Sequence, residues 1–136
     1  LKHVRILGPE RSATQIELAQ TDCRNIGIQA PVRSSGDTKG TPGVTLRGPG
    51  GTLTVPEGVM IADRHIHMTP AQAAAFGLAD GDRVQVKIDG PKPGVMGGVL
   101  IRANDKCALD FHIDTDDGNA FLLKQGQLVT VLGKEE

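Results

Sequence analysis

The composition of this chain limits what it can be. It has 136 residues, a formal net charge of −1 and 38% hydrophobic residues, with three Phe and no Trp or Tyr. This length fits one ordinary domain or two very small ones, and the core must be largely aliphatic. No apolar run reaches the roughly 18 residues of a membrane helix, so no membrane partner is expected. With no basic stripe and almost no aromatic residue for base stacking, nucleic acid is not expected as a partner either.

The first half of the chain is predicted to consist of short strands and turns. Its Gly and Pro residues (18 and 8 in the whole chain) favour short strands over long helices. Alternating apolar residues predict strands over 3–9, 14–18 and 58–62, and a hairpin over 44–55. One helical turn is expected at 21–28, with Thr21 as N-cap and Gly27 at its end. The loop over 31–43 is long enough to be functional.

The second half carries clearer signals. Thr69 as N-cap, Pro70 at the first helical position and Gly77 at the end predict a helix over 69–78. We expect strands at 82–88, 95–103, 107–114 and 127–132, and a short helix at 116–126. The pattern predicts a mainly β protein built from small β-barrels. Two Cys do not make a disulfide framework, so a reducing cytosol is the expected location.

Two of the four histidines, His65 and His67, are separated by one residue in the stretch IADRHIHMTPAQ. Side chains at positions i and i+2 of a strand share one face, so both imidazoles could converge on a metal ion. A pair of ordinary surface or core histidines is the alternative. Asp63 and Arg64 before the pair and the capped helix after it favour metal binding, because the backbone here is expected to be a fixed strand-to-helix corner.

His112 lies in the acidic stretch DFHIDTDDGNA. Carboxylates near a histidine can hold its ring by accepting the second N–H, as they do around zinc. They are equally suited to the start of a helix, and we expect Asp114 or Thr115 to cap the helix that begins near residue 116. From these residues alone, a ligand role and a structural role for His112 stay equally open.

Other candidate residues are weaker by themselves. Glu17 can be an ordinary strand carboxylate, and Arg11 a solvated charge. If phosphate is bound, an Arg in a Gly/Pro-rich loop is a suitable clamp, because its planar guanidinium binds two oxygens at once. His3 is expected on the surface of a strand. Cys23 and Cys107 have no base nearby in sequence, and we interpret both as core thiols.

Four stretches of the sequence occur in the same order in one known family. They are VRILGPERSATQIELAQTD, PVRSSGDTKGTPGVTLRGP, GVMIADRHIHMTPAQAAAFGL and LDFHIDTDDGNA. Over essentially its whole length the chain resembles the PduL-type phosphate acyltransferases, or phosphate propanoyltransferases. The resemblance implies a zinc-dependent enzyme that transfers a propanoyl or acetyl group directly between coenzyme A and inorganic phosphate. It also implies a bacterial cytoplasmic location, in some cases inside a microcompartment that degrades propanediol or similar carbon sources.

The resemblance also implies a fold and a site. The family has two small antiparallel β-barrels with short capping helices, here 1–62 and 63–136, with two zinc ions and a coenzyme A pocket between them. Carried onto this sequence, Arg11 becomes the catalytic residue that binds phosphate. The ligands of one zinc become Glu17, His65, His67 and His112. Three imidazoles and a carboxylate are a reasonable zinc set, although cobalt, nickel or iron also suit them.

The sequence departs from the family in two places. The family has an earlier segment with its own HxH pair, and this sequence has no counterpart. Each barrel is therefore expected to lack a strand, which invites an oligomer or complementation by that segment. Gly118 stands where the family more often has Ala, which weakens the helix by roughly 1 kcal/mol. Two other functions stay open: a non-catalytic zinc-binding β-domain or structural partner, and a zinc-dependent thioester hydrolase.

Overall fold

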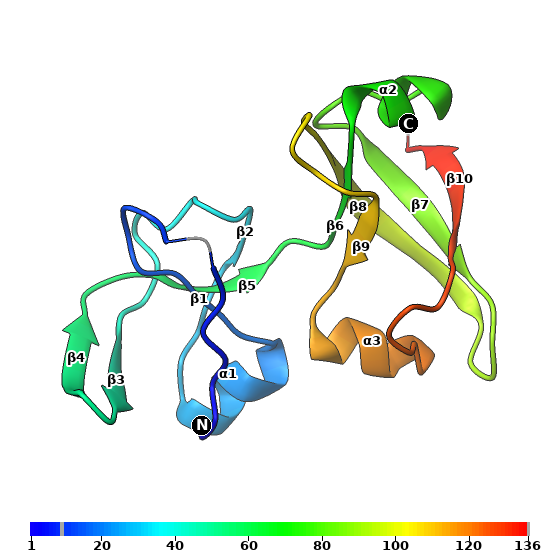
Figure 1. Ribbon diagram of the computed structural model, residues 1–136. Coiled ribbons are helices and arrows are strands. Elements are labelled where there is room, and N and C mark those ends of the chain that lie inside the picture. Colours follow the sequence, from blue (N-terminus) through cyan, green and yellow to red (C-terminus); the bar gives the residue numbers. More distant parts are fainter. Residues whose placement is uncertain (9, 136) are drawn as a thin grey trace. The chain divides into compact units, whose positions relative to one another are not determined.

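The chain divides into two compact units, Leu1–Ala62 and Asp63–Glu136 (Figure 1). The computed structural model describes residues 1–8 and 10–135. Both units consist mainly of β-strands, as expected, and each helix in the described part of the chain has six or seven residues. Among the described residues, no helix combines the length and the apolar character needed to cross a membrane.

The first unit contains a small parallel sheet and a separate hairpin. The sheet has the order β1 (Ile16–Glu17), β5 (Val59–Ala62), β2 (Val32–Arg33), and both pairs are parallel. The hairpin consists of β3 (Val44–Gly48) and β4 (Gly51–Val55), where the sequence predicted it. The short helix α1 (Gln20–Ile26) follows β1. The core of this unit is built from Ile16, Leu18, Cys23, Val55 and Val59.

Two expectations for the first unit were wrong. Residues 3–8 form no strand, and Pro9, which the predicted strand also includes, lies outside the described residues. Ile6 is 98% exposed, so this segment does not bury the apolar face that holds a strand in place. His3 is exposed as expected, but with φ of 58° it is not in a strand. Helix α1 has Ala19 rather than Thr21 at its N-cap, whereas Gly27 ends it in the left-handed conformation as predicted.

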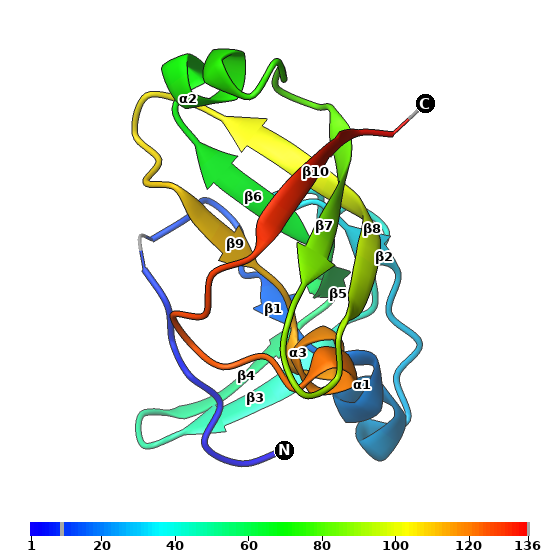
Figure 2. The same cartoon turned by 90° about the vertical axis from the view of Figure 1, so that its right-hand side faces the viewer.

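The second unit is a single five-stranded sheet in the order β10-β7-β8-β6-β9 (Figure 2). Its strands, in chain order, are β6 (His65–Met68), β7 (Arg83–Ile88), β8 (Gly94–Ala103), β9 (Asp110–His112) and β10 (Thr130–Lys134). Strand β6 runs parallel to β8 and antiparallel to β9, and the remaining pairs are antiparallel. Helix α2 (Pro70–Ala75) follows β6, and helix α3 (Thr115–Phe121) follows β9.

Strict alternation of side chains builds the core of the second unit. In β7 every second residue is buried, and Val84, Val86 and Ile88 are fully inaccessible to solvent. Neighbouring strands add Ile66, Met68, Met96, Val99 and Ile101 to the same cluster. The core is therefore aliphatic, as a chain without Trp or Tyr requires.

Side-chain caps fix the helices that follow β6 and β9. The Thr69 hydroxyl accepts from the Gln72 backbone N–H, and the Gln72 side chain accepts from the Thr69 N–H, so the two form a capping box. Asp114 caps α3 by accepting from the Asp117 N–H at 2.8 Å. Both predicted caps are confirmed, and each such cap contributes about 1 kcal/mol.

The prediction of two antiparallel barrels was wrong about the direction of some strands. Three strand pairs are parallel: β1 with β5, β2 with β5, and β6 with β8. The five-stranded sheet ends at β9 and β10, so the described strands show no closure into a barrel. Turn signals in the sequence mark where strands end but leave the direction of their partners open, because parallel pairing depends on long crossover connections.

The glycine in α3 gives a test of this local structure. Gly118 lies inside the helix, and a Cβ atom there would be 3.8 Å from Ile113 Cδ1, an ordinary contact. Gly118→Ala is therefore expected to raise the free energy of unfolding by up to about 1 kcal/mol in urea denaturation. Gly126→Ala is the control, because Gly126 has φ of +79° and Ala is expected to lower stability there. A loss of stability with Gly118→Ala would contradict the prediction.

Candidate metal centre

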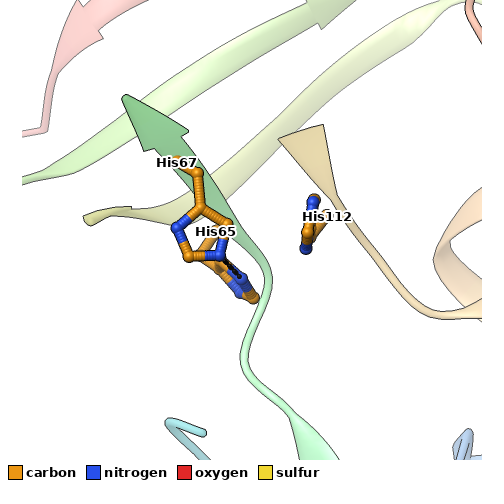
Figure 3. A group of neighbouring side chains, drawn as sticks. All are labelled: His65, His67 and His112. Atoms are coloured by element: carbon orange, nitrogen blue, oxygen red, sulfur yellow. Dashed lines mark hydrogen bonds between the residues drawn. The ribbon is translucent and has the colours of Figure 1, made fainter. Parts of the chain in front are cut away.

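The register of β6 against β9 brings three histidines together (Figure 3). His65 is paired with His112, and His67 is paired with Asp110. These four residues therefore share one face of the sheet, because side chains alternate along each strand. Ile66 and Met68 point to the opposite face and are buried in the core. The HIHM sequence of β6 thus places its apolar residues inward and both imidazoles on the site face.

The three imidazole rings lie within ligand-sharing distance. Ring centroids are 4.7 Å apart for His65 and His67, 5.0 Å for His65 and His112, and 4.8 Å for His67 and His112. One nitrogen from each ring can be chosen so that all three lie within 4.8 Å of one another. Among the described residues, this is the group of His, Cys, Asp and Glu side chains that could hold a metal ion.

Each of the three rings has a second nitrogen that contacts another protein group. His65 Nδ1 lies 2.7 Å from the Asp63 carbonyl oxygen, and His67 Nδ1 lies 3.1 Å from Cys107 Sγ. His112 Nε2 lies 3.2 Å from Asp110 Oδ2. Metal-binding histidines commonly use their second nitrogen in this way, which fixes the ring and its tautomer.

The donor set and the spacing of its closest pair suit a zinc ion. The Nε2 atoms of His65 and His67 are 3.2 Å apart. Two nitrogens bound to a tetrahedral zinc at 2.0–2.1 Å lie roughly 3.4 Å apart, so this pair already has the required separation. His65 is buried, His67 half-buried and His112 exposed, so the cluster can be reached from the His112 side.

The surroundings keep His67 neutral, which is the form that binds metals. Burial lowers its pKa most, and the neighbouring His65, His112 and Arg102 lower it further because they oppose a second positive charge. The carboxylate of Asp110 acts in the opposite direction but is the smallest of these effects. A neutral imidazole keeps a lone pair available to a cation.

The corner before the histidine pair is held by two ion pairs. Asp63 binds the Arg83 guanidinium through both carboxylate oxygens, at 3.3 and 2.6 Å. Arg64 contacts Asp117 in helix α3 at 3.2 Å. The backbone carbonyl of Asp63 also accepts the hydrogen bond from His65, so the first of these pairs steadies a group that orients a ring. The fixed corner expected from the sequence is present.

Arg11 and Glu17 belong to the first unit. Arg11 is exposed and lines a small surface pocket together with Ser12, Ala13, Gln15, Gly36 and Thr38. The Gln15 side chain donates to Glu17 Oε1 at 2.6 Å and accepts from the Gly36 backbone N–H at 2.7 Å. The Gln15 side chain therefore contacts both the Glu17 carboxylate and the loop over 31–43. Gln15 also lines the pocket that contains Arg11. The joint role of Glu17 with the three histidines stays a prediction.

The interpretation of both cysteines as core thiols is correct for only one of them. Cys23 is fully buried in the first unit. Cys107 is half-buried in the loop between β8 and β9, and it contacts His67. Cys107 and His67 are 40 positions apart in the sequence, so local spacing gives no sign of this contact.

Comparison with known proteins assigns the chain to a family. A model of the phosphate propanoyltransferase family matches residues 1–124. A phosphate propanoyltransferase of Thermotoga maritima is 45% identical over 133 residues, which cover 97% of this chain and 63% of that protein. One from Lachnoclostridium phytofermentans is 44% identical, with coverages of 97% and 62%, and one from Salmonella typhimurium is 48% identical, with coverages of 88% and 58%.

The matches extend along nearly all of this chain but not along all of its relatives. The chain spans about three fifths of the length of the curated relatives it matches. Identity near 45% over more than 120 residues, together with the family match, leaves no other assignment. The chain belongs to the phosphate propanoyltransferase family.

Proposed function

We propose that this protein takes part in phosphate acyltransfer, converting an acyl-CoA and inorganic phosphate to an acyl phosphate and coenzyme A. The observation that carries this proposal is the three-histidine cluster, found in a chain of the phosphate propanoyltransferase family. Propanoyl-CoA is the proposed acyl donor, on the strength of the name that the relatives bear. Acetyl-CoA is the second donor, which the family resemblance implies.

The metal in this proposal is zinc, held by His65, His67 and His112, with Glu17 as the further ligand implied by the family resemblance. When bound, zinc supplies a positive charge that polarises a carbonyl group or orients a phosphate anion. The chain's own contribution is to hold the rings. Strand pairing sets the spacing of the three side chains, and the second-nitrogen contacts orient them.

Arg11 is the proposed phosphate-binding residue. It lines a pocket whose other members include two hydroxyl side chains, Ser12 and Thr38. A guanidinium and hydroxyls are suitable donors to phosphate oxygens. Held there, a phosphate oxygen would attack the thioester carbonyl carbon. The bond from that carbon to sulfur then breaks, and the leaving thiolate takes up a proton.

A thiol-release assay separates this function from its rivals. Acetyl-CoA or propanoyl-CoA is supplied with and without phosphate, and free coenzyme A thiol is followed. We expect release that depends on phosphate, since phosphate is the acyl acceptor. Release without phosphate would instead indicate a thioester hydrolase.

The same assay is repeated with the part of the Thermotoga maritima relative that this chain does not match, added as a separate polypeptide. Phosphate-dependent release that appears only in the mixture still supports a transferase site that the added part completes. Silence in both formats, with zinc bound, would indicate a non-catalytic zinc-binding domain and overturn the proposal.

Metal binding is tested by removing one proposed ligand. His67→Ala is expected to lose zinc, measured as metal per chain by elemental analysis of purified protein, because one of the three rings is gone. His3→Ala is the matched control, since His3 is exposed and lies in the other unit, and its zinc content should equal that of the original protein. Full zinc content in His67→Ala would remove His67 from the site.

The phosphate role is tested at Arg11. Arg11→Ala is expected to lower kcat/KM for phosphate by roughly 10- to 100-fold, which corresponds to the loss of one charge-assisted hydrogen bond. Arg47→Ala, at an exposed position in β3 of the same unit, is the control for loss of a positive charge. Equal kinetics for the two variants would argue against a phosphate contact by Arg11.

A further inference from the structure

Cys107 has no part in the function proposed above, yet its sulfur lies 3.1 Å from Nδ1 of His67. We propose that Cys107 is a positioning residue of the metal centre, which holds the His67 ring so that Nε2 faces the cation. This inference rests on the proposed metal site. It concerns a cysteine that the sequence had marked only as a core thiol.

The loop that carries Cys107 is anchored beside the strand that carries His67. The Asn104 N–H donates to the Met68 carbonyl at 3.0 Å, directly after His67 in β6. Asn104 then folds the loop into a turn, because its side chain accepts from the Lys106 N–H and its carbonyl accepts from the Cys107 N–H. The contact between thiol and imidazole is thus set by backbone hydrogen bonds rather than by chance approach of a surface side chain.

The hydrogen bonds of the cluster define which atoms donate. A carbonyl oxygen only accepts, so His65 Nδ1 carries the proton toward Asp63 and His65 Nε2 carries a lone pair. His67 Nε2, 3.2 Å away, then donates to it. A His67 ring with its single proton on Nε2 has a lone pair on Nδ1, which accepts from the Cys107 S–H.

Metal binding reverses the direction of the last bond. To bind a cation through Nε2, the neutral His67 ring must carry its proton on Nδ1 instead, and this N–H then donates to Cys107 Sγ. The total number of protons on the ring is unchanged. A thiol both donates and accepts, so Cys107 can serve both forms, which neither a carbonyl nor an ammonium group can do.

The position of Cys107 argues against two other roles. As a ligand, its sulfur would converge with the ring nitrogens, yet the converging group among the described residues consists of the three histidines alone. As a nucleophile, it would need His67 as its base, but that ring is committed to the cation through its other nitrogen. A ligand role and a nucleophile role for Cys107 can each be distinguished from a positioning role by experiment.

The test compares metal affinities of the 136-residue chain and its variants. Zinc is titrated in competition with a chromophoric chelator. Cys107→Ala is expected to bind zinc about 10-fold more weakly, the lower end of the effect of removing a partner of a metal-bound histidine. Cys107→Ser, which still donates and accepts, is expected to recover most of the affinity. Cys23→Ala, which removes the other cysteine, is expected to match the original protein.

The tautomer of His67 gives a readout that needs no variant. In the zinc-loaded original protein, long-range ¹H–¹⁵N correlation of the His67 ring should show the proton on Nδ1. The cobalt-substituted protein should lack the near-ultraviolet charge-transfer absorption of a sulfur ligand.

Several results would overturn the inference. The positioning role is wrong if the NMR correlation shows the His67 proton on Nε2 in the zinc-loaded protein. It is also wrong if the cobalt protein shows a sulfur charge-transfer band that Cys107→Ala removes, because Cys107 is then a ligand. An acyl adduct on Cys107 with acyl-CoA alone would show that it is a nucleophile. If Cys107→Ala and the original protein bind zinc with equal affinity, Cys107 has no positioning role, but the proposed metal site is unaffected. Failure of the original protein to bind zinc or cobalt would reject the metal site itself.

Discussion

The candidate site depends on the register of one short strand. Strand β6 lies between β8 and β9, and its pairing with β9 places His65 opposite His112 and His67 opposite Asp110. A shift of one residue would turn both imidazoles toward the core and Ile66 and Met68 toward the site face. The register is held by those two apolar side chains, which are 3% and 0% exposed. The same burial that stabilises the second unit therefore aligns its histidines.

The histidine cluster is built with support around each ring. A backbone carbonyl, a thiol and a carboxylate occupy the second nitrogens of the three rings, and the Asp63 carbonyl is itself steadied by the ion pair with Arg83. This arrangement leaves one nitrogen of each ring available on the shared face. Burial lowers the pKa of His67 most, and the nearby His65 and His112 rings lower it further because they oppose an added positive charge. The neutral ring keeps a lone pair for a cation.

The first unit presents a different kind of chemistry. Its parallel sheet carries Glu17 at the edge strand β1, and the preceding loop carries Arg11. Gln15 lies between them in sequence and contacts both Glu17 and the loop over 31–43. The guanidinium of Arg11 and the hydroxyls of Ser12 and Thr38 suit an anion, whereas the histidines of the second unit suit a cation, for which Glu17 is the further ligand in the proposal. The proposed acyltransfer uses both kinds of site.

Local sequence determined the elements whose signals are themselves local. The capped helix after Thr69, the hairpin around Gly48–Gly51, the Asp114 cap and the shared face of His65 and His67 all follow from spacing and turn chemistry. Family resemblance, not spacing, pointed to His112 as a partner of that pair. Only the tertiary structure decided that three strand pairs are parallel, that residues 3–8 form no strand, and that Cys107 touches His67. Those features depend on which distant segments meet, and such contacts are set by the packing of the whole unit rather than by neighbouring residues.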